Sequence, residues 1–251
     1  MERVVEEEWL DDDRGTPEEI RAALHSITLV NQRFGGVRLH ARLLRQALAR
    51  ASREHRPHIL EVASGRADVL QAALLRIHGS AEAVPDHAPH SAPDVKVPGV
   101  TAPDVTLLDA SAVHLPDPRA WPATLPAPRV IQGNALDLPL SDASVDIVSC
   151  CLFLHHLEPE QVMRFLAEAH RVARVAVVIN DLERTALHYR LAQLNRIIDR
   201  SRISRHDGPV SVRRAYTRQE LAHMLQNTGR SFLLKRAWLY RLGAVLWCDA
   251  R

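Results

Sequence analysis

The chain has 251 residues, of which 46% are hydrophobic, enough for one α/β domain with additions or for two small domains. Its 32 basic and 30 acidic residues nearly cancel, and no long basic run with interleaved aromatics appears, so we do not expect nucleic acid as a partner. The acidic start MERVVEEEWLDDD lacks the apolar core of a signal peptide, and no apolar run approaches the ~20 residues that span a bilayer. The three cysteines show no disulfide framework, which favours a reducing cytoplasm.

Two helices are predicted before the first strand. The sequence TPEE at 16–19 combines an N-cap threonine, a proline at the first helical position and the glutamate of a capping box. This helix should run to about Arg33 and end at Gly35-Gly36. A second amphipathic helix is predicted over 37–53. We therefore interpret residues 1–55 as an N-terminal helical cap.

A break in composition follows the next predicted unit, a strand over 58–63, a turn over 64–67 and a helix from 68. Ten of the fifteen prolines lie from Pro85 to Pro128. Because residues 78–103 show little periodicity, we expect a flexible insertion there. Four histidines lie from His78 to His114, but their spacing matches no tight ligand motif, so no metal site is predicted.

Strand and helix patterns alternate along the rest of the chain. Further strands are predicted at 105–109, 129–132, 145–150, 173–180, 231–235 and 239–247. Helices are predicted at 158–172, 183–200 and 217–227, with a polar loop at 201–214. This alternation indicates an α/β fold with a mainly parallel sheet covered on both faces.

A strand followed by a glycine turn and a helix is typical of a corner that binds a nucleoside at the carboxyl edge of a sheet. Asp109 ends the second strand, where a carboxylate can accept both ribose hydroxyls. A dinucleotide fold would place G-x-G-x-x-G in the turn, whereas Ala63, Gly65 and Asp68 occupy those glycine positions. A cofactor without phosphates therefore fits better than NAD.

The segments ILEVASGRADV, VTLLDAS and VIQGNALDLPLSDASVDIVSCCLFLHHL, taken in order, resemble the motifs of class I S-adenosylmethionine-dependent methyltransferases of the ubiquinone-biosynthesis type. The resemblance spans roughly residues 57–180. It implies a Rossmann-like seven-stranded sheet whose last strand inserts antiparallel beside the fifth, with core residues 56–251. It also implies S-adenosyl-L-methionine across the carboxyl ends of the first four strands, and S-adenosyl-L-homocysteine as the product.

The resemblance also implies cofactor contacts at strand ends. They are Glu61 for the methionine amino group, indirectly or through water, the backbone of Ala63, Ser64 and Gly65 beneath the cofactor, Asp109 for the ribose with Ala110 against adenine, Asn134 and Ala135 at the adenine edge, and Cys150 and Cys151 beside the methionine. Apart from the resemblance, Arg33 or the loop amides of residues 31–36 could contact the cofactor's carboxylate. Asp109 could instead cap its strand, and Asn134 could form a turn. The family's turn glycines are Ala63 and Ala67 here, and its acidic residue is Asn134.

His155 and His156 follow the fourth strand, near the expected reaction centre. In the similar phosphobase methyltransferases a histidine just before the final leucine of this segment is catalytic, and His156 holds that position. A base is needed only for a phenol or enol acceptor, and the two histidines could instead orient the loop or contact the cofactor.

Residues 181–214 are interpreted as a substrate lid. We expect Asn180, Asp181, His206 and Asp207 to contact the substrate, with His206 a third candidate base, although His206 and Asp207 could form a surface turn. The sequences NDLER and HDGPVSVRRA resemble a bacterial subgroup linked with polyketide or quinone-like substrates of secondary metabolism.

These observations predict O- or C-methylation of a phenolic, polyketide or quinone-like small molecule by a cytoplasmic monomer or homodimer. One alternative is a cofactor-binding partner subunit without catalysis. Another is an NAD-dependent oxidoreductase, which the turn disfavours. A nucleic-acid methyltransferase is disfavoured because no basic domain is present.

Overall fold

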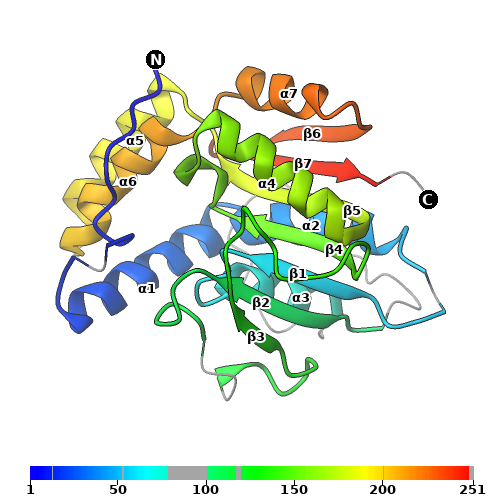
Figure 1. Cartoon of the computed structure of the whole chain (residues 1–251). Helices are drawn as coiled ribbons and strands as arrows, with labels where there is room; N and C mark the ends of the chain where they lie inside the picture. Colours follow the sequence, from blue (N-terminus) through cyan, green and yellow to red (C-terminus); the bar gives the residue numbers. More distant parts are fainter. Residues whose placement is uncertain (13, 53, 79–100, 117–119, 200, 249–251) are drawn as a thin grey trace.

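The computed structural model describes residues 1–12, 14–52, 54–78, 101–116, 120–199 and 201–248. A seven-stranded sheet forms its centre, in the order β3-β2-β1-β4-β5-β7-β6 (Figure 1). The strands are β1 (His58–Val62), β2 (Asp104–Asp109), β3 (Arg129–Gln132), β4 (Val145–Cys151), β5 (Ala173–Leu182), β6 (Phe232–Ala237) and β7 (Arg241–Trp247). All seven predicted strands are therefore confirmed, with small shifts at their ends.

The first five strands are parallel, and β7 inserts antiparallel between β5 and β6. The inner strands β1, β4 and β5 are rich in valine and isoleucine, as expected of strands buried on both faces. This order is the one that the family resemblance implies. It also brings the carboxyl ends of β1 to β5 to a single edge, where the ligands of open α/β sheets bind.

Helices cover both faces of the sheet. On one face, α2 (Gly36–Leu48) and α3 (Asp68–His78) pack against a core that includes Leu43, Leu70 and Ile147. On the other, α4 (Pro159–Val172) and α7 (Arg218–Asn227) pack around Phe165, which is fully buried. The short 3₁₀ helix η2 (Leu154–His156) joins β4 to α4.

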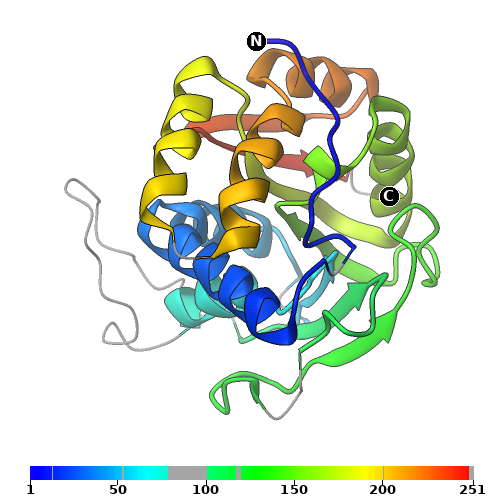
Figure 2. The ribbon, with the colours of Figure 1, turned by 90° about the vertical axis from the view of Figure 1, so that its left-hand side faces the viewer.

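A third group of segments lies beyond the carboxyl edge of the sheet. It consists of α1 (Pro17–Arg33), α5 (Ala186–Ile198), α6 (Arg202–Arg214) and the N-terminal segment of residues 1–12. Figure 1 shows them gathered on the left of the sheet, and Figure 2 looks directly onto them, with the N-terminal segment running down beside α6. Helix α2 packs on the sheet itself, whereas α1 packs against α6, α2 and α3.

The prediction of a polar loop over 201–214 is wrong, because this stretch forms α6. Ser201 caps the helix by accepting from the backbone N–H of Ser204, and Ile203, Val210 and Val212 are buried. Burial of these side chains outweighs the loss of one backbone hydrogen bond at Pro209. The second predicted helix is also shorter than expected, since α2 ends at Leu48.

Most of the predicted insertion, residues 79–100, lies outside the described residues. None of the described helices has the length and apolar character that a membrane crossing requires.

Candidate active site

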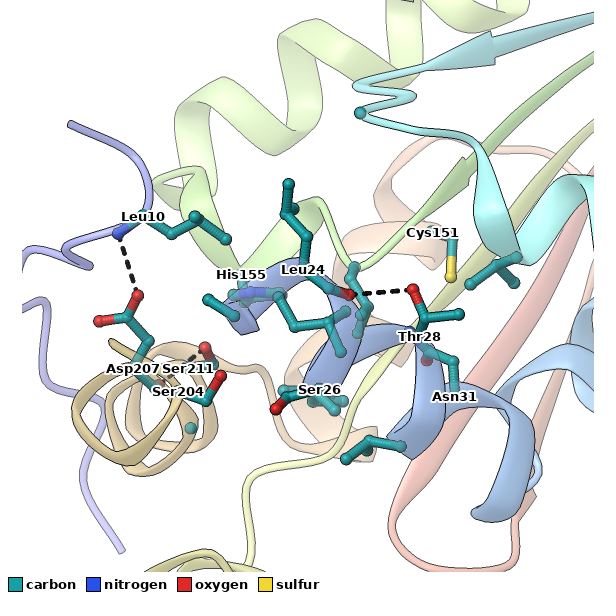
Figure 3. A pocket seen from close by; sticks show the side chains of 18 of the residues that line it. Leu10, Leu24, Ser26, Thr28, Asn31, Cys151, His155, Ser204, Asp207 and Ser211 are labelled. Atoms are coloured by element: carbon teal, nitrogen blue, oxygen red, sulfur yellow. Dashed lines mark hydrogen bonds between the residues drawn. The ribbon is translucent and has the colours of Figure 1, made fainter. Parts of the chain in front are cut away.

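A cavity of about 520 Å³ lies between the carboxyl edge of the sheet, α1, α5, α6 and the N-terminal segment. Its walls are mostly apolar, with Leu10, Ile27, Leu191 and Ile203 among the lining side chains. Polar groups gather at two ends. Figure 3 shows Thr28, Asn31 and Cys151 toward one end and His155, Asp207 and Ser211 toward the other.

The loop between β1 and α3 forms part of the first end. Ala63, Gly65 and Ala67 all adopt left-handed backbone conformations, with φ of 50°, 45° and 55°. Such a conformation costs an alanine roughly 1–2 kcal/mol relative to the right-handed region. The loop thus takes a glycine-type path although two of the family's glycines are alanines.

Asp109 holds this loop from the end of β2. Its carboxylate accepts from the backbone N–H of Gly65 at 2.8 Å and of Ser111 at 3.0 Å. Ala110 and Asn134 beside it are exposed, while Ala135 is buried. Asn134 accepts from the N–H of Leu136, so it also forms the turn that the sequence offered as its alternative role.

Glu61, at the end of β1, lines the cavity as a buried carboxyl group, 3% exposed. Burial raises its pKa to about 8, against a smaller opposing effect of a hydrogen bond with Ser149. His40 lies 3.9 Å away, but burial lowers the pKa of this imidazole to about 3, so it is neutral and cannot balance a carboxylate. Within the described part of the chain, Glu61 Oε2 has no hydrogen-bond partner.

Arg241, at the start of β7, lines the same cavity and is 3% exposed. Its Nη2 donates to Asn31 Oδ1 at 2.6 Å, whereas no described residue accepts from Nη1. Burial also lowers the pKa of this guanidinium, since the buried cation is costly. Burial raises the pKa of the nearby Cys151 thiol, an effect that the charge of Arg241 opposes and that of Glu61 reinforces.

A buried carboxyl group and a buried guanidinium, each with one unpartnered atom, therefore face one cavity. Unpaired buried polar groups are costly unless a ligand completes them. An α-amino acid zwitterion offers an ammonium group for Glu61 and a carboxylate for Arg241. These residues thus fit the methionine part of S-adenosylmethionine.

The second end of the cavity holds two neighbouring histidines. His155 is buried, and its Nδ1 lies 2.6 Å from Asp181 Oδ1. His156 is partly exposed, and its Nδ1 lies 3.0 Å from Asp11 Oδ2. Each imidazole therefore has a carboxylate on Nδ1, which leaves Nε2 for another partner.

Glu8 lies against these histidines, with Oε1 3.8 Å from His155 Nε2. Burial raises the pKa of Glu8 to about 7, partly offset by the charge of His156. Burial also acts to raise the pKa of Asp181 and of Asp11. The charges and hydrogen bonds of His155 and His156 outweigh it and hold both values below the usual range.

The other residues predicted for the site fall in three kinds of place. Cys151 and Asp207 line the cavity, and Asp207 accepts from the backbone N–H groups of Trp9 and Leu10. Cys150 and Asn180 are buried, and Asn180 donates to the carbonyl of Gly36. Arg33 and His206 are not among the lining residues; Arg33 is exposed and His206 stacks on Trp9 at 4.0 Å.

Sequence reasoning missed Glu8, Asp11 and Arg241. The two carboxylates belong to an acidic run that reads as a solvated segment, and only the apolar Trp9-Leu10 pair within it hints at burial. Arg241 begins an otherwise apolar strand, where a cation is unexpected. That mismatch was the one available signal.

A family model described as "Methyltransferase domain" matches residues 98–178. No curated protein matches the chain. Among solved structures, a plantazolicin methyltransferase, BpumL, shares 11% identity over 97% of this chain and 94% of its own, with a TM-score of 0.65. A second, BamL, shares 14% identity over 93% and 92%, with a TM-score of 0.62. A SAM-dependent methyltransferase from Aquifex aeolicus shares 16% over 87% and 92%, with a TM-score of 0.53.

At these identities the solved structures show a shared fold, and the implied strand order is confirmed. The ubiquinone-biosynthesis subfamily stays a prediction. The methyltransferase-domain match over residues 98–178 and this shared fold support a class I S-adenosylmethionine-dependent methyltransferase.

Proposed function

We propose that the enzyme methylates an apolar small molecule, at oxygen or carbon of a phenolic, polyketide or quinone-like group. The cavity itself supports this proposal. Its walls are mostly apolar, and the end where we place the methyl acceptor has one group of polar side chains, Glu8, His155 and His156. Small-molecule sites combine mostly apolar walls with a few convergent polar groups in this way.

The cofactor end uses the strand ends. Glu61 binds the amino group of the methionine, and Arg241 with Asn31 binds its carboxylate, in place of the predicted Arg33. The backbone of residues 63–65 passes beneath the cofactor, Asp109 binds the ribose, and Ala110, Asn134 and Ala135 border the adenine. Cys151 lies beside the methionine portion. When bound, the cofactor supplies a methyl group on a positively charged sulfur.

The acceptor end lies under α1, α5 and α6. Apolar side chains such as Ile27, Leu191 and Ile203 form its walls. The plantazolicin methyltransferases of similar fold were crystallised with SAH and desmethylPZN analogues, which supports a small acceptor in a cavity of this kind. Asp207 positions the N-terminal segment as one wall.

The group that receives the methyl lies against Glu8, His155 and His156. When the acceptor is a hydroxyl group, its proton passes to Nε2 of His155. Asp181 holds this ring through Nδ1 and stabilises its protonated form, as the carboxylate of a catalytic triad does. A positioned base of this kind contributes roughly 10²–10⁴-fold. His156 is the second candidate for the same proton.

The test is transfer of radiolabelled methyl groups from S-adenosylmethionine to a panel of apolar phenols, hydroxyquinones and polyketide-like enols. Label should move into the organic phase, and His155→Gln should slow the transfer roughly 10²–10⁴-fold. Label found only in protein or nucleic acid from a total lysate would overturn the proposal. S-adenosylhomocysteine binding without transfer to any fraction would instead favour a cofactor-binding partner subunit.

A further inference from the structure

Two imidazoles and a carboxylate meet at the acceptor end of the cavity. Glu8, His155 and His156 each offer one potential ligand atom, and these atoms all lie within 4.8 Å of one another. No other group of three such residues occurs in the part of the chain that the structure describes. Two imidazoles with one carboxylate form a ligand set used by zinc and non-haem iron enzymes.

Both imidazoles are oriented as metal ligands are. A ligating histidine almost always bonds through its other ring nitrogen to a carboxylate or carbonyl, which fixes the ring. Here Asp181 holds Nδ1 of His155 at 2.6 Å, and Asp11 holds Nδ1 of His156 at 3.0 Å. Nε2 of each ring is therefore the nitrogen left to bind an ion.

Glu8 provides an independent indication. Its Oε2 accepts from the hydroxyl of Ser211 at 2.9 Å, which fixes the carboxylate. Its Oε1 is buried and has no hydrogen-bond partner among the described residues, although His155 Nε2 and Arg214 Nη1 each lie 3.8 Å away. The residue is only 6% exposed and lines the cavity, so a ligand bound there could complete this oxygen.

The charges around the cluster favour a divalent cation. Glu8, Asp11 and Asp181 contribute three carboxylates, whereas Arg214 contributes one guanidinium, 3.8 Å from Glu8 Oε1 and 3.5 Å from Asp11 Oδ2. The carboxyl groups around the cluster thus outnumber its guanidinium group, and such surroundings suit a cation.

We propose that Glu8, His155 and His156 bind a divalent transition-metal ion, such as Zn²⁺ or Fe²⁺, in the wall of the cavity. Magnesium and calcium prefer oxygen ligands, so the two imidazoles disfavour them. Three protein ligands leave a position open toward the cavity, as in catalytic metal sites. If the enzyme acts as proposed, the acceptor oxygen would occupy this open position, and coordination to the ion would replace His155 in promoting loss of the proton. This role rests on the proposed function, whereas the binding of the ion does not.

Titration of the chelator-treated full chain with Co²⁺, followed by visible absorption, and with Zn²⁺, followed by calorimetry, tests the site. One ion should bind per chain. Glu8→Gln and His156→Gln should weaken binding at least tenfold, because each removes a ligand. Asp11→Asn, which removes the carboxylate that orients His156 but no proposed ligand, should weaken it roughly 10–100-fold. His223→Gln, at an exposed histidine of α7, is the matched control and should change nothing.

Circular dichroism and S-adenosylhomocysteine affinity show whether each variant still folds and keeps its cofactor site, because Glu61 and Arg241, which we assign to the cofactor, are not among the proposed ligands. The absence of one-to-one binding in the folded wild type, or binding that survives both Glu8→Gln and His156→Gln, would overturn the metal site. Methyl transfer by a chain that binds no ion would contradict the metal site and leave the proposed function standing. An ion bound without methyl transfer to any acceptor would support the metal site and contradict the proposed function.

Discussion

Two residues at the end of the cavity that we assign to the cofactor have buried polar atoms that a ligand could satisfy. Glu61 and Arg241 are both buried, and each keeps one polar atom without a partner among the described residues. Such unsatisfied buried groups lower the stability of the ligand-free chain and strengthen the binding of a ligand that pairs with them. Glu61 stands in the predicted cofactor motif, whereas Arg241 reaches the site only because β7 lies beside β5.

Binding of the cofactor product should release a proton through Glu61. The free carboxyl, with a pKa raised to about 8 by burial, is mostly protonated at pH 7, whereas a bound ammonium group favours the carboxylate. S-adenosylhomocysteine should therefore release about one proton at pH 7, and its affinity should rise with pH up to about 8 and then level off.

Calorimetry in buffers of different ionisation enthalpy measures this proton. Glu61→Gln should bind more weakly and show no dependence of the heat on the buffer. A wild-type heat that is the same in every buffer would mean that Glu61 does not ionise on binding.

A second expectation concerns Asp109. Asp109→Asn should weaken S-adenosylhomocysteine at least tenfold, because a charge-assisted hydrogen bond is worth about 1.5–3 kcal/mol. It should weaken methylthioadenosine similarly, since that analogue keeps the ribose. Glu61→Gln and Arg241→Gln, in contrast, should leave methylthioadenosine binding nearly unchanged.

Asp104→Asn, at the exposed opposite end of the same strand, provides the control for Asp109. Normal affinity for both ligands in a folded Asp109→Asn chain would show that this carboxylate only supports the β1–α3 loop, through its bonds to Gly65 and Ser111.

At the scale of elements, the sequence predicts what local pattern determines. Apolar runs identified every strand, and the capping box at Thr16 marked the start of α1. The glycine and proline of α6 predicted a loop, but packing of Ile203 and Val210 imposed a helix. The cluster of Glu8 and His155 joins residues nearly 150 positions apart, so no local pattern could predict it.

The helix α5 offers a test of the apolar entrance to the cavity. Leu191 and Leu194 are exposed yet line the cavity, as does Ile27 of α1. The double variant Leu191→Ser with Leu194→Ser should raise the KM for an apolar acceptor several-fold. Burial of one leucine side chain against a ligand stabilises the complex by roughly 1.5–3 kcal/mol at most.

Leu187→Ser is the matched control, since Leu187 is exposed on the same helix but does not line the cavity. Steady-state kinetics with the acceptor found by methyl transfer gives the comparison, and thermal unfolding should be unchanged in both the double variant and the control. An equal effect of Leu187→Ser on KM would mean that α5 acts through its packing and not as an entrance.

At the scale of the whole molecule, the N-terminal segment closes the acceptor end. Arg3 donates to the carbonyls of Arg214 and Leu157, and so joins α6 to the segment after η2. The backbone of Trp9 and Leu10 donates to Asp207, and Figure 3 shows this contact between Leu10 and Asp207 at one side of the cavity. The first residues of the chain thereby position Glu8 against a histidine that follows β4.

Deletion of residues 2–14 should separate the two halves of the site. The sheet and the groups that we assign to the cofactor, Glu61 and Arg241, do not belong to this segment, so S-adenosylhomocysteine affinity should stay nearly unchanged. Methyl transfer should fall at least tenfold, because Glu8 and one wall of the cavity are lost. The free energy of unfolding should fall by a few kcal/mol, at about 1 kcal/mol for each lost hydrogen bond. Glu7→Gln, at a carboxylate that is mostly exposed, is the control and should leave the affinity, the methyl transfer and the free energy of unfolding nearly unchanged. Full methyl transfer by the shortened chain would show that the segment only stabilises the fold, and that the acceptor is activated by residues of the core alone.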